Sequence, residues 1–153
     1  MSNRSKLGTN AVWLFGLATL VAAIGVTYAL PHVTGPISPK VASAVYFTIY
    51  GAGATLAVLL TSAGVLRTIG ALGVASIGLG TFYYIVVARA TSAAAEQLGA
   101  SASGASAVGS SVGLVFAIGF GVAALAGSSA GALFGAKLRR GFARPVLSRH
   151  SAG

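Results

Sequence analysis

The side chains that usually transfer protons, bind metals or attack substrates are scarce in this chain of 153 residues. It contains one acid, Glu96, two histidines, His32 and His150, and no cysteine. Metal sites of the usual kinds need clustered His, Cys, Asp or Glu ligands, and the sequence has no such cluster. We expect the two histidines on opposite sides of a membrane, where they could not share a haem. The sequence therefore predicts no metal site and no cofactor of its own.

Catalysis has equally little support. Residues 101–111 are rich in serine, but no base or orienting acid accompanies them. No Gly-rich segment follows a predicted strand, so the glycines do not form a phosphate loop. We expect Glu96 to be a solvated carboxylate, although it could pair with Arg89, with Lys40 or with a partner protein, for at most about 1 kcal/mol. The sequence predicts a protein that is not an enzyme.

Composition predicts a chain whose solvent is mostly lipid. Charged residues make up 7% and hydrophobic residues 56%, whereas about a quarter of a soluble domain is charged. Four apolar runs are each long enough to cross a hydrocarbon core of about 30 Å as a helix, and none holds Asp, Glu, Lys, Arg or His. The predicted spans are 11–30, 41–63, 69–88 and 108–134. The predicted fold is an all-α integral membrane four-helix bundle, one polytopic domain over 1–153 with a basic tail at 137–153.

The connections follow from the same pattern. We expect Pro31 to end the first span, and we expect residues 31–40, 61–68 and 89–107 to connect the spans. Arg4 and Lys6 resemble the charged start of a signal peptide. The apolar run behind them is longer than a typical signal core, and no cleavage site of the A-x-A type follows it. We therefore expect this first span to be a signal anchor.

Orientation follows from the positive-inside rule, which counts Lys and Arg in short loops. Four spans place both termini and the middle turn on one side, and only Lys40 and Arg89 on the other. The first side holds most of the basic residues: Arg4, Lys6, Arg67, Lys137, Arg139, Arg140, Arg144 and Arg149. We expect both termini in the cytoplasm. Abundant Ala, Gly and Arg are typical of a GC-rich genome, so we expect a multi-pass protein of a prokaryotic plasma (inner) membrane.

The aromatic residues fit this map. All the tyrosines fall toward the outer ends of the first three spans: Tyr28, Tyr46, Tyr50, Tyr83 and Tyr84. Tyrosine favours the headgroup boundary, so we expect an interfacial belt. The alternative is an outer-leaflet pocket lined by Tyr46, Tyr50, Tyr83 and Tyr84. Such a pocket, or an interface with a partner, would hold a lipid, a quinone or a pigment.

The fourth span carries the strongest packing motif. Small residues recur at every fourth position in two rows, and each row lies on one helix face where another helix can approach closely. The predicted helix-packing residues form a glycine zipper: Gly109, Gly113, Gly121, Gly127, Gly131 and Gly135. The sequence leaves open whether the neighbour is another span of this chain or a partner protein.

Basic residues interleave with apolar ones beyond the fourth span. They are Lys137, Arg139, Arg140, Arg144 and Arg149. Such a tail suits docking on anionic lipid or on a partner, at about 1 kcal/mol per basic residue near the surface. The positive-inside rule alone would also explain the basic residues of the tail. We expect no nucleic-acid partner.

These features together predict a function by exclusion. The spans lack side chains for catalysis or metal binding. Their small-residue surface is larger than four thin helices can bury against one another. We expect a small non-catalytic accessory subunit of a larger inner-membrane complex of respiratory or photosynthetic type, with other integral membrane subunits as partners. The alternative is a homo-oligomeric channel or carrier for a neutral or apolar solute, with a pore lined by Gly, Ser and Thr.

Overall fold

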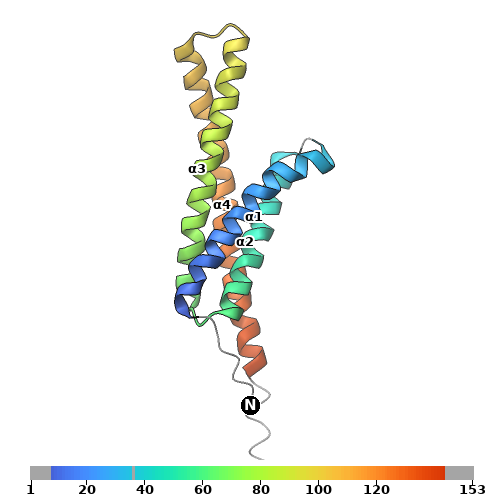
Figure 1. The fold of residues 1–153 in the computed structure, drawn as a ribbon, viewed down its shortest axis with the longest axis vertical. Helices are drawn as coiled ribbons and strands as arrows, with labels where there is room; N and C mark the ends of the chain where they lie inside the picture. Colours follow the sequence, from blue (N-terminus) through green and yellow to red (C-terminus); the bar gives the residue numbers. More distant parts are fainter. Residues whose placement is uncertain (1–7, 36, 144–153) are drawn as a thin grey trace, which may run out of the picture.

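The computed structural model describes residues 8–35 and 37–143, and this part of the chain is all-α (Figure 1). Its elements are the 3-10 turn η1 (Thr9–Ala11) and the helices α1 (Val12–Thr34), α2 (Pro39–Leu60), α3 (Val65–Gln97) and α4 (Ala102–Ala143). All four helices are long and apolar enough to cross a membrane. The predicted bundle of four membrane-spanning helices is confirmed.

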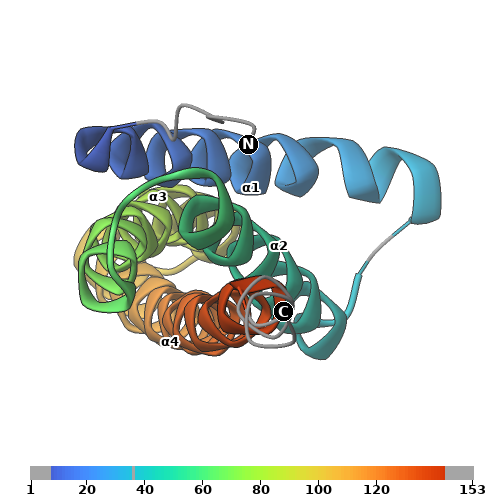
Figure 2. The ribbon, with the colours of Figure 1, turned by 90° about the horizontal axis from the view of Figure 1, so that it is seen from below.

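Helices α2 and α3 pack against α4, and α1 packs against α2 and α3. Helix α4 makes its most extensive contacts with α3 and then with α2. Seen from below, α1 lies across one side of α2 and α3, and α4 lies on the opposite side (Figure 2). Along its length α4 passes from the side of α3 to the side of α2 (Figure 1).

The first helix continues past the proline that we expected to end it. Helix α1 includes Pro31 and ends at Thr34, before Gly35 with a φ of 77°. A proline inside a helix removes one N–H donor and favours a kink, but the flanking turns can compensate. Here the Thr34 hydroxyl donates to the Leu30 carbonyl at 2.9 Å, and the Gly35 N–H donates to the Pro31 carbonyl at 3.0 Å. These bonds close the last turn after the proline.

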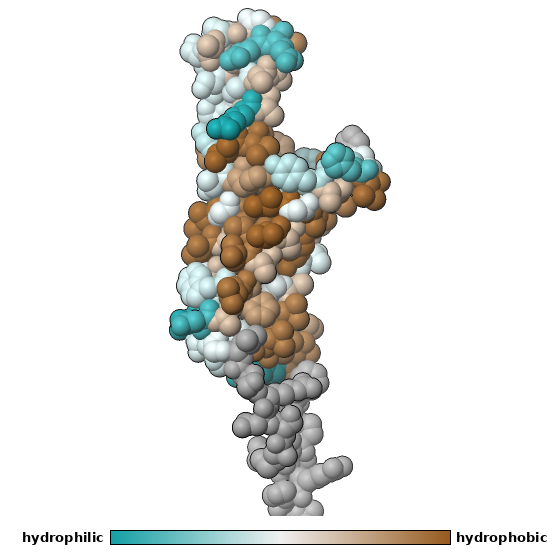
Figure 3. Space-filling model, in the orientation of Figure 1, coloured by the Kyte–Doolittle hydropathy of each residue, from teal (hydrophilic) through white to brown (hydrophobic). Residues whose placement is uncertain are grey.

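Residues 89–107, which we expected as a connection, are mostly helical. Helix α3 runs to Gln97 and α4 begins at Ala102, so only a short turn joins them. At about 1.5 Å per residue, α3 and α4 reach about 50 Å and 63 Å, well beyond a hydrocarbon core of about 30 Å. The hairpin of α3 and α4 therefore projects past α1 and α2, and its tip is markedly less apolar than the band below it (Figures 1 and 3).

The interior of the bundle is filled by side chains. The largest fully buried apolar side chains belong to Tyr50, Leu72, Leu79, Val12 and Val58. Buried serine and threonine hydroxyls donate to the carbonyl four residues earlier in the chain, as in the bond from Ser128 to Ala124 at 2.8 Å. In the described ranges no buried side-chain nitrogen or oxygen lacks a hydrogen-bond partner. The core is therefore closed and its polar side chains are satisfied from within.

Removing the Tyr50 hydroxyl tests a long-range hydrogen bond at the centre of this core. The phenol donates to the Ala75 carbonyl of α3 at 2.9 Å. We expect Tyr50→Phe to lower the free energy of unfolding by about 0.6 kcal/mol, the average for membrane hydrogen bonds. Unfolding by sodium dodecyl sulfate in mixed micelles measures this change. Tyr84→Phe is the matched control, because that side chain is 39% exposed; equal effects at both sites would contradict the assignment.

Candidate functional site

Three hydroxyl groups from three helices meet toward the end of the bundle where α1 ends and α2 begins. Thr27 of α1, Tyr46 of α2 and Tyr83 of α3 form what we call the hydroxyl cluster. The Thr27 Oγ1 lies 2.8 Å from the Tyr46 hydroxyl and 3.0 Å from the Tyr83 hydroxyl. The two phenol oxygens also hydrogen-bond to each other. Thr27 itself donates to the Ala23 carbonyl at 2.9 Å, which anchors the cluster to α1.

Aromatic packing holds the two phenols in place. Phe120 of α4 lies 5.2 Å from the Tyr46 ring and 4.5 Å from the Tyr83 ring, measured between centroids. The rings of Tyr46 and Tyr83 meet edge to face at 5.7 Å, an arrangement that aromatic quadrupoles favour. All four helices therefore contribute to this site, and both tyrosine side chains are buried.

A cavity of about 360 Å³ opens beside the hydroxyl cluster. It lies between α1, α2 and α3, and Ile37 of the connection between α1 and α2 also lines it. Besides the hydroxyl cluster its wall is aliphatic: Val26, Leu30, Pro31, Ile37, Ala42 and Val45. The site therefore offers an apolar volume with polar atoms at one place on its wall.

The structure does not gather the four tyrosines of the predicted outer-leaflet pocket into one cavity. Tyr46 and Tyr83 line the cavity just described, and Tyr84 lines a separate groove between α3 and α4. Tyr50 is fully buried and lines neither of these two spaces. The expected interfacial belt does not hold for Tyr46, Tyr50 and Tyr83, because aromatic packing and hydrogen bonds draw these phenols into the core. Tyr28, at 58% exposure, still faces outward.

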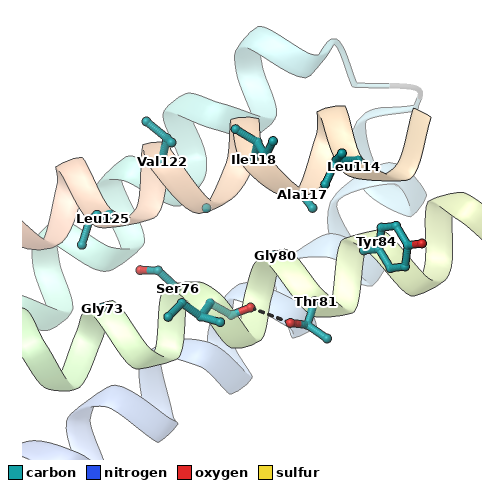
Figure 4. Close-up of a pocket in the computed structure, with 12 residues that line it drawn as sticks. Gly73, Ser76, Gly80, Thr81, Tyr84, Leu114, Ala117, Ile118, Val122 and Leu125 are labelled. Atoms are coloured by element: carbon teal, nitrogen blue, oxygen red, sulfur yellow. Dashed lines mark hydrogen bonds between the residues drawn. The ribbon is translucent and has the colours of Figure 1, made fainter. Parts of the chain in front are cut away.

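The groove between α3 and α4 has a volume of about 580 Å³ and is apolar (Figure 4). Its floor is formed where the two backbones touch: a Cβ on Gly80 would lie 3.2 Å from the Ala117 carbonyl oxygen. Ser76 and Thr81 line it, but each donates its hydroxyl hydrogen to its own helix. The apolar part of the wall comes mainly from α4 and includes Leu114, Ile118, Val122 and Leu125. This groove can cover an apolar chain or helix face but offers little polar recognition.

The glycines in the second half of α4 lie against α2. A Cβ on Gly127 would come closer than 3.0 Å to the backbone of Phe47, and a Cβ on Gly131 would do the same at Gly51. A Cβ on Gly135 would lie 3.0 Å from the Thr55 carbonyl oxygen. Across this contact the Thr55 hydroxyl lies 2.9 Å from the Gly51 carbonyl and 3.0 Å from the Gly131 carbonyl. The two backbones are in direct contact here.

The glycines in the first half of α4 lie against α3. A Cβ on Gly109 would clash with Ser92 and the Ala88 carbonyl, and one on Gly113 would lie 2.9 Å from the Tyr84 carbonyl oxygen. Gly121 is looser, with a carbonyl oxygen of α3 3.8 Å away. Gly109 and Gly127 are about five turns apart at 3.6 residues per turn, so they share one face of α4. That face contacts α3 first and α2 further along.

Sequence reasoning missed the residues that seat α1. A Cβ on Gly16 would lie 3.1 Å from a carbonyl oxygen of α3, and Gly53 of α2 makes room for the Thr19 side chain. Spacing could have marked this face, because Gly16, Thr19 and Ala23 are three and four residues apart and therefore lie on one side of α1. Sequence reasoning also missed Thr27, the third member of the hydroxyl cluster, and no sequence signal pairs it with the tyrosines.

Four of the described basic residues lie at the end of the bundle where α1 begins and α4 ends. Arg139 and Arg140 line a cavity of about 340 Å³ with Ala63, Gly64 and Val65 near the turn between α2 and α3. Arg67, just beyond that turn, donates to the Asn10 side chain at 2.8 Å. Lys137 is exposed near the end of α4. The predicted docking residues Arg144 and Arg149 lie outside the described residues, as do Arg4 and Lys6.

The side chains that could bind a metal or transfer a proton do not form a described cluster. His32 is exposed in the last turn of α1, and His150 lies outside the described residues. Glu96 is exposed near the end of α3, on the projecting hairpin. Across residues 8–35 and 37–143 no group of His, Cys, Asp or Glu could hold a metal ion.

The chain matches no protein-family model, no curated protein and no solved structure. Its function is therefore inferred from its own residues and their geometry.

Adding one methyl group to Gly131 tests the contact between α4 and α2. In Gly131→Ala the new Cβ meets the Gly51 backbone, which cannot move aside as a side chain would. We expect overpacking to cost about 1–3 kcal/mol of stability. Thermal unfolding in mild detergent measures it, with Gly70→Ala as matched control, because a Cβ there meets nothing within 4 Å. Equal stability of the two variants would show that the contact is not tight.

Proposed function

We propose that this chain is a small non-catalytic subunit of a larger membrane complex, of respiratory or photosynthetic type, in a prokaryotic inner membrane. The observation that carries the proposal is the amount of apolar surface directed outward. In the most apolar stretch of each helix only 22–39% of the residues are buried. Four helices that bury so little on one another leave most of their surface to lipid and to other proteins.

Three outward glycines within the apolar helices mark where a partner helix could approach closely. Gly25 of α1, Gly70 of α3 and Gly119 of α4 are exposed, and a Cβ on any of them would meet nothing within 4 Å. They therefore play no part in packing within one copy. In lipid, helix association depends on close packing at small residues, because lipid tails are as apolar as leucine. These positions support contact with other membrane-spanning subunits.

The closed core supports this role over transport through a single copy. Tyr50 and Leu72 are fully buried where a pore would run. The outward faces carry apolar side chains such as Leu14, Ile77 and Val115, which are 67–71% exposed. A pore between identical copies would be lined by such residues rather than by polar ones. The outward surface thus suits partners and lipid better than a solute.

The proposal includes an orientation with both termini in the cytoplasm. Arg67, Lys137, Arg139 and Arg140 lie at the end of the bundle where α1 begins and α4 ends, and the positive-inside rule assigns that end to the cytoplasm. Arginines in a cavity at this end also support binding of anionic lipid headgroups, worth about 1 kcal/mol per basic residue near the surface. The projecting hairpin of α3 and α4 would then lie outside the cytoplasm.

Purification of the tagged chain from its own membranes in mild detergent tests the subunit role. We expect it to elute with larger membrane proteins, well above its own 15.0 kDa. Gly25→Leu, Gly70→Leu and Gly119→Leu should each leave the isolated chain folded, since a Cβ at these positions meets nothing within 4 Å. We expect at least one of these variants to lose the larger proteins. A ring of identical copies that passes solute in liposomes would favour a channel and contradict the proposal.

Single-cysteine labelling tests the orientation cleanly, because the chain has no cysteine of its own. Ala100→Cys lies in the turn between α3 and α4, and Gly64→Cys lies in the turn between α2 and α3. We expect a membrane-impermeant maleimide to label Ala100→Cys in intact spheroplasts and Gly64→Cys only after the membrane is opened. The reverse pattern would place both termini outside.

A further inference from the structure

We propose that the cavity beside the hydroxyl cluster binds an apolar molecule through a hydroxyl group on that molecule. Hydroquinones and membrane alcohols share this chemistry. The cavity lies within one copy of the chain, so the inference does not depend on the proposed subunit role. It rests on the shape of the cavity, on the hydrogen bonds of the hydroxyl cluster and on the position of Pro31.

The cavity has the size and lining of a small-molecule site. Its volume of about 360 Å³ falls within the range of about 300–1,000 Å³ typical of ligand pockets, which are mostly apolar with a few placed polar groups. The aliphatic wall excludes charged ligands. Among the described residues that line the cavity, only the hydroxyl cluster has polar side-chain atoms: Thr27, Tyr46 and Tyr83. A ligand would therefore be apolar and would be oriented by these three oxygens.

Counting hydroxyl hydrogens and lone pairs shows which polar group of a ligand the hydroxyl cluster can bind. Each hydroxyl has one hydrogen and two lone pairs. The Thr27 hydrogen goes to the Ala23 carbonyl. Tyr46 and Tyr83 each lie within hydrogen-bond reach of Thr27 and of one another, so both phenol hydrogens have acceptors inside the cluster. Every donor is satisfied, while the three oxygens keep spare lone pairs.

Pro31 leaves one backbone carbonyl of α1 without its usual helical donor. In a regular helix the Thr27 carbonyl accepts from the N–H of residue 31, and proline has no N–H. Thr27 and Pro31 both line the cavity. In a membrane, a carbonyl without its helical donor favours a nearby hydrogen-bond donor. A ligand hydroxyl that reaches this carbonyl would gain a further hydrogen bond.

The surplus of acceptors makes the site selective. A ligand hydroxyl adds a hydrogen bond and breaks none. A ligand that only accepts, such as a quinone, must take a phenol hydrogen away from Thr27 or from the other tyrosine, so it exchanges one bond for another. One net hydrogen bond corresponds to a difference in affinity of about threefold to tenfold. The reduced form of a quinone should bind more tightly than its oxidised form by that factor.

Binding to the full chain in phosphatidylcholine nanodiscs under anaerobic conditions tests this selectivity. The probes are durohydroquinone and duroquinone, which have the same ring and methyl groups and differ in the hydroxyl hydrogens. We expect the reduced probe to bind about threefold to tenfold more tightly by calorimetric titration. Dihydrocholesterol, an alcohol on a saturated ring system, is the probe for membrane alcohols. Tighter binding of this probe or of durohydroquinone shows which of the two ligand sources the cavity prefers. Equal or tighter binding of duroquinone, or no binding of either hydroxyl probe, would overturn the proposal.

Variants locate the binding within the molecule. Ala42→Leu and Val26→Phe fill the cavity without altering the hydroxyl cluster, and we expect either to weaken binding at least about tenfold, the loss of one or two well-made contacts. Tyr83→Phe removes one acceptor and leaves the Tyr46 hydrogen paired with Thr27, so durohydroquinone should bind more weakly than it does to the wild type. Tyr84→Phe, in the separate groove, should bind as the wild type does.

Each variant is compared only if it melts as the wild type does. Undiminished binding to a folded, filled variant contradicts the proposal. The wild-type comparison of the two redox forms decides alone if none of the variants folds.

Discussion

The direct contact of the α4 backbone with the backbones of α2 and α3 is the constraint on which the rest of the structure depends. Lipid gives no hydrophobic drive between helices, so dispersion at close range must hold them together. Gly127 and Gly131 bring α4 onto α2, and Gly109 and Gly113 bring it onto α3. A side chain at any of these positions would separate two backbones. Because one face of α4 makes both contacts, the positions of α2 and α3 are fixed relative to each other.

The hydroxyl cluster follows from this arrangement. Phe120 of α4 packs against Tyr46 of α2 and Tyr83 of α3, and the fixed spacing of those two helices brings their phenols within hydrogen-bond reach. Helix α1, seated through Gly16 on α3, then contributes Thr27. The polar groups satisfy one another at a depth where an unpaired group would be costly. Burying these three hydroxyl groups costs little free energy only because close helix packing places them within hydrogen-bond reach of one another.

Hydropathy predicted the four spans well, because the thickness of the bilayer sets how many consecutive apolar residues a spanning helix needs. It could not predict where the helices end. Residues 89–107 are small and polar, which marks where the chain leaves lipid, yet Gly109 lets α3 and α4 stay paired beyond that point. Pro31 was expected to stop α1, but local hydrogen bonds extend the helix to Thr34. The glycines of α4 could be found by their spacing, while the grouping of the hydroxyl cluster depends on helix crossings that no single-chain pattern encodes.

Inward and outward small residues have different consequences. Glycines at backbone contacts determine one arrangement of the four helices, and substitution there acts on folding. Gly25, Gly70 and Gly119 have open space around them, so selection for internal packing does not account for them. Glycine lowers helix propensity in water by about 1 kcal/mol relative to alanine, a cost that a close external neighbour would offset. The bundle is thus tightly packed where it contacts itself and leaves space for close neighbours at its outer glycines, as the proposed subunit role requires.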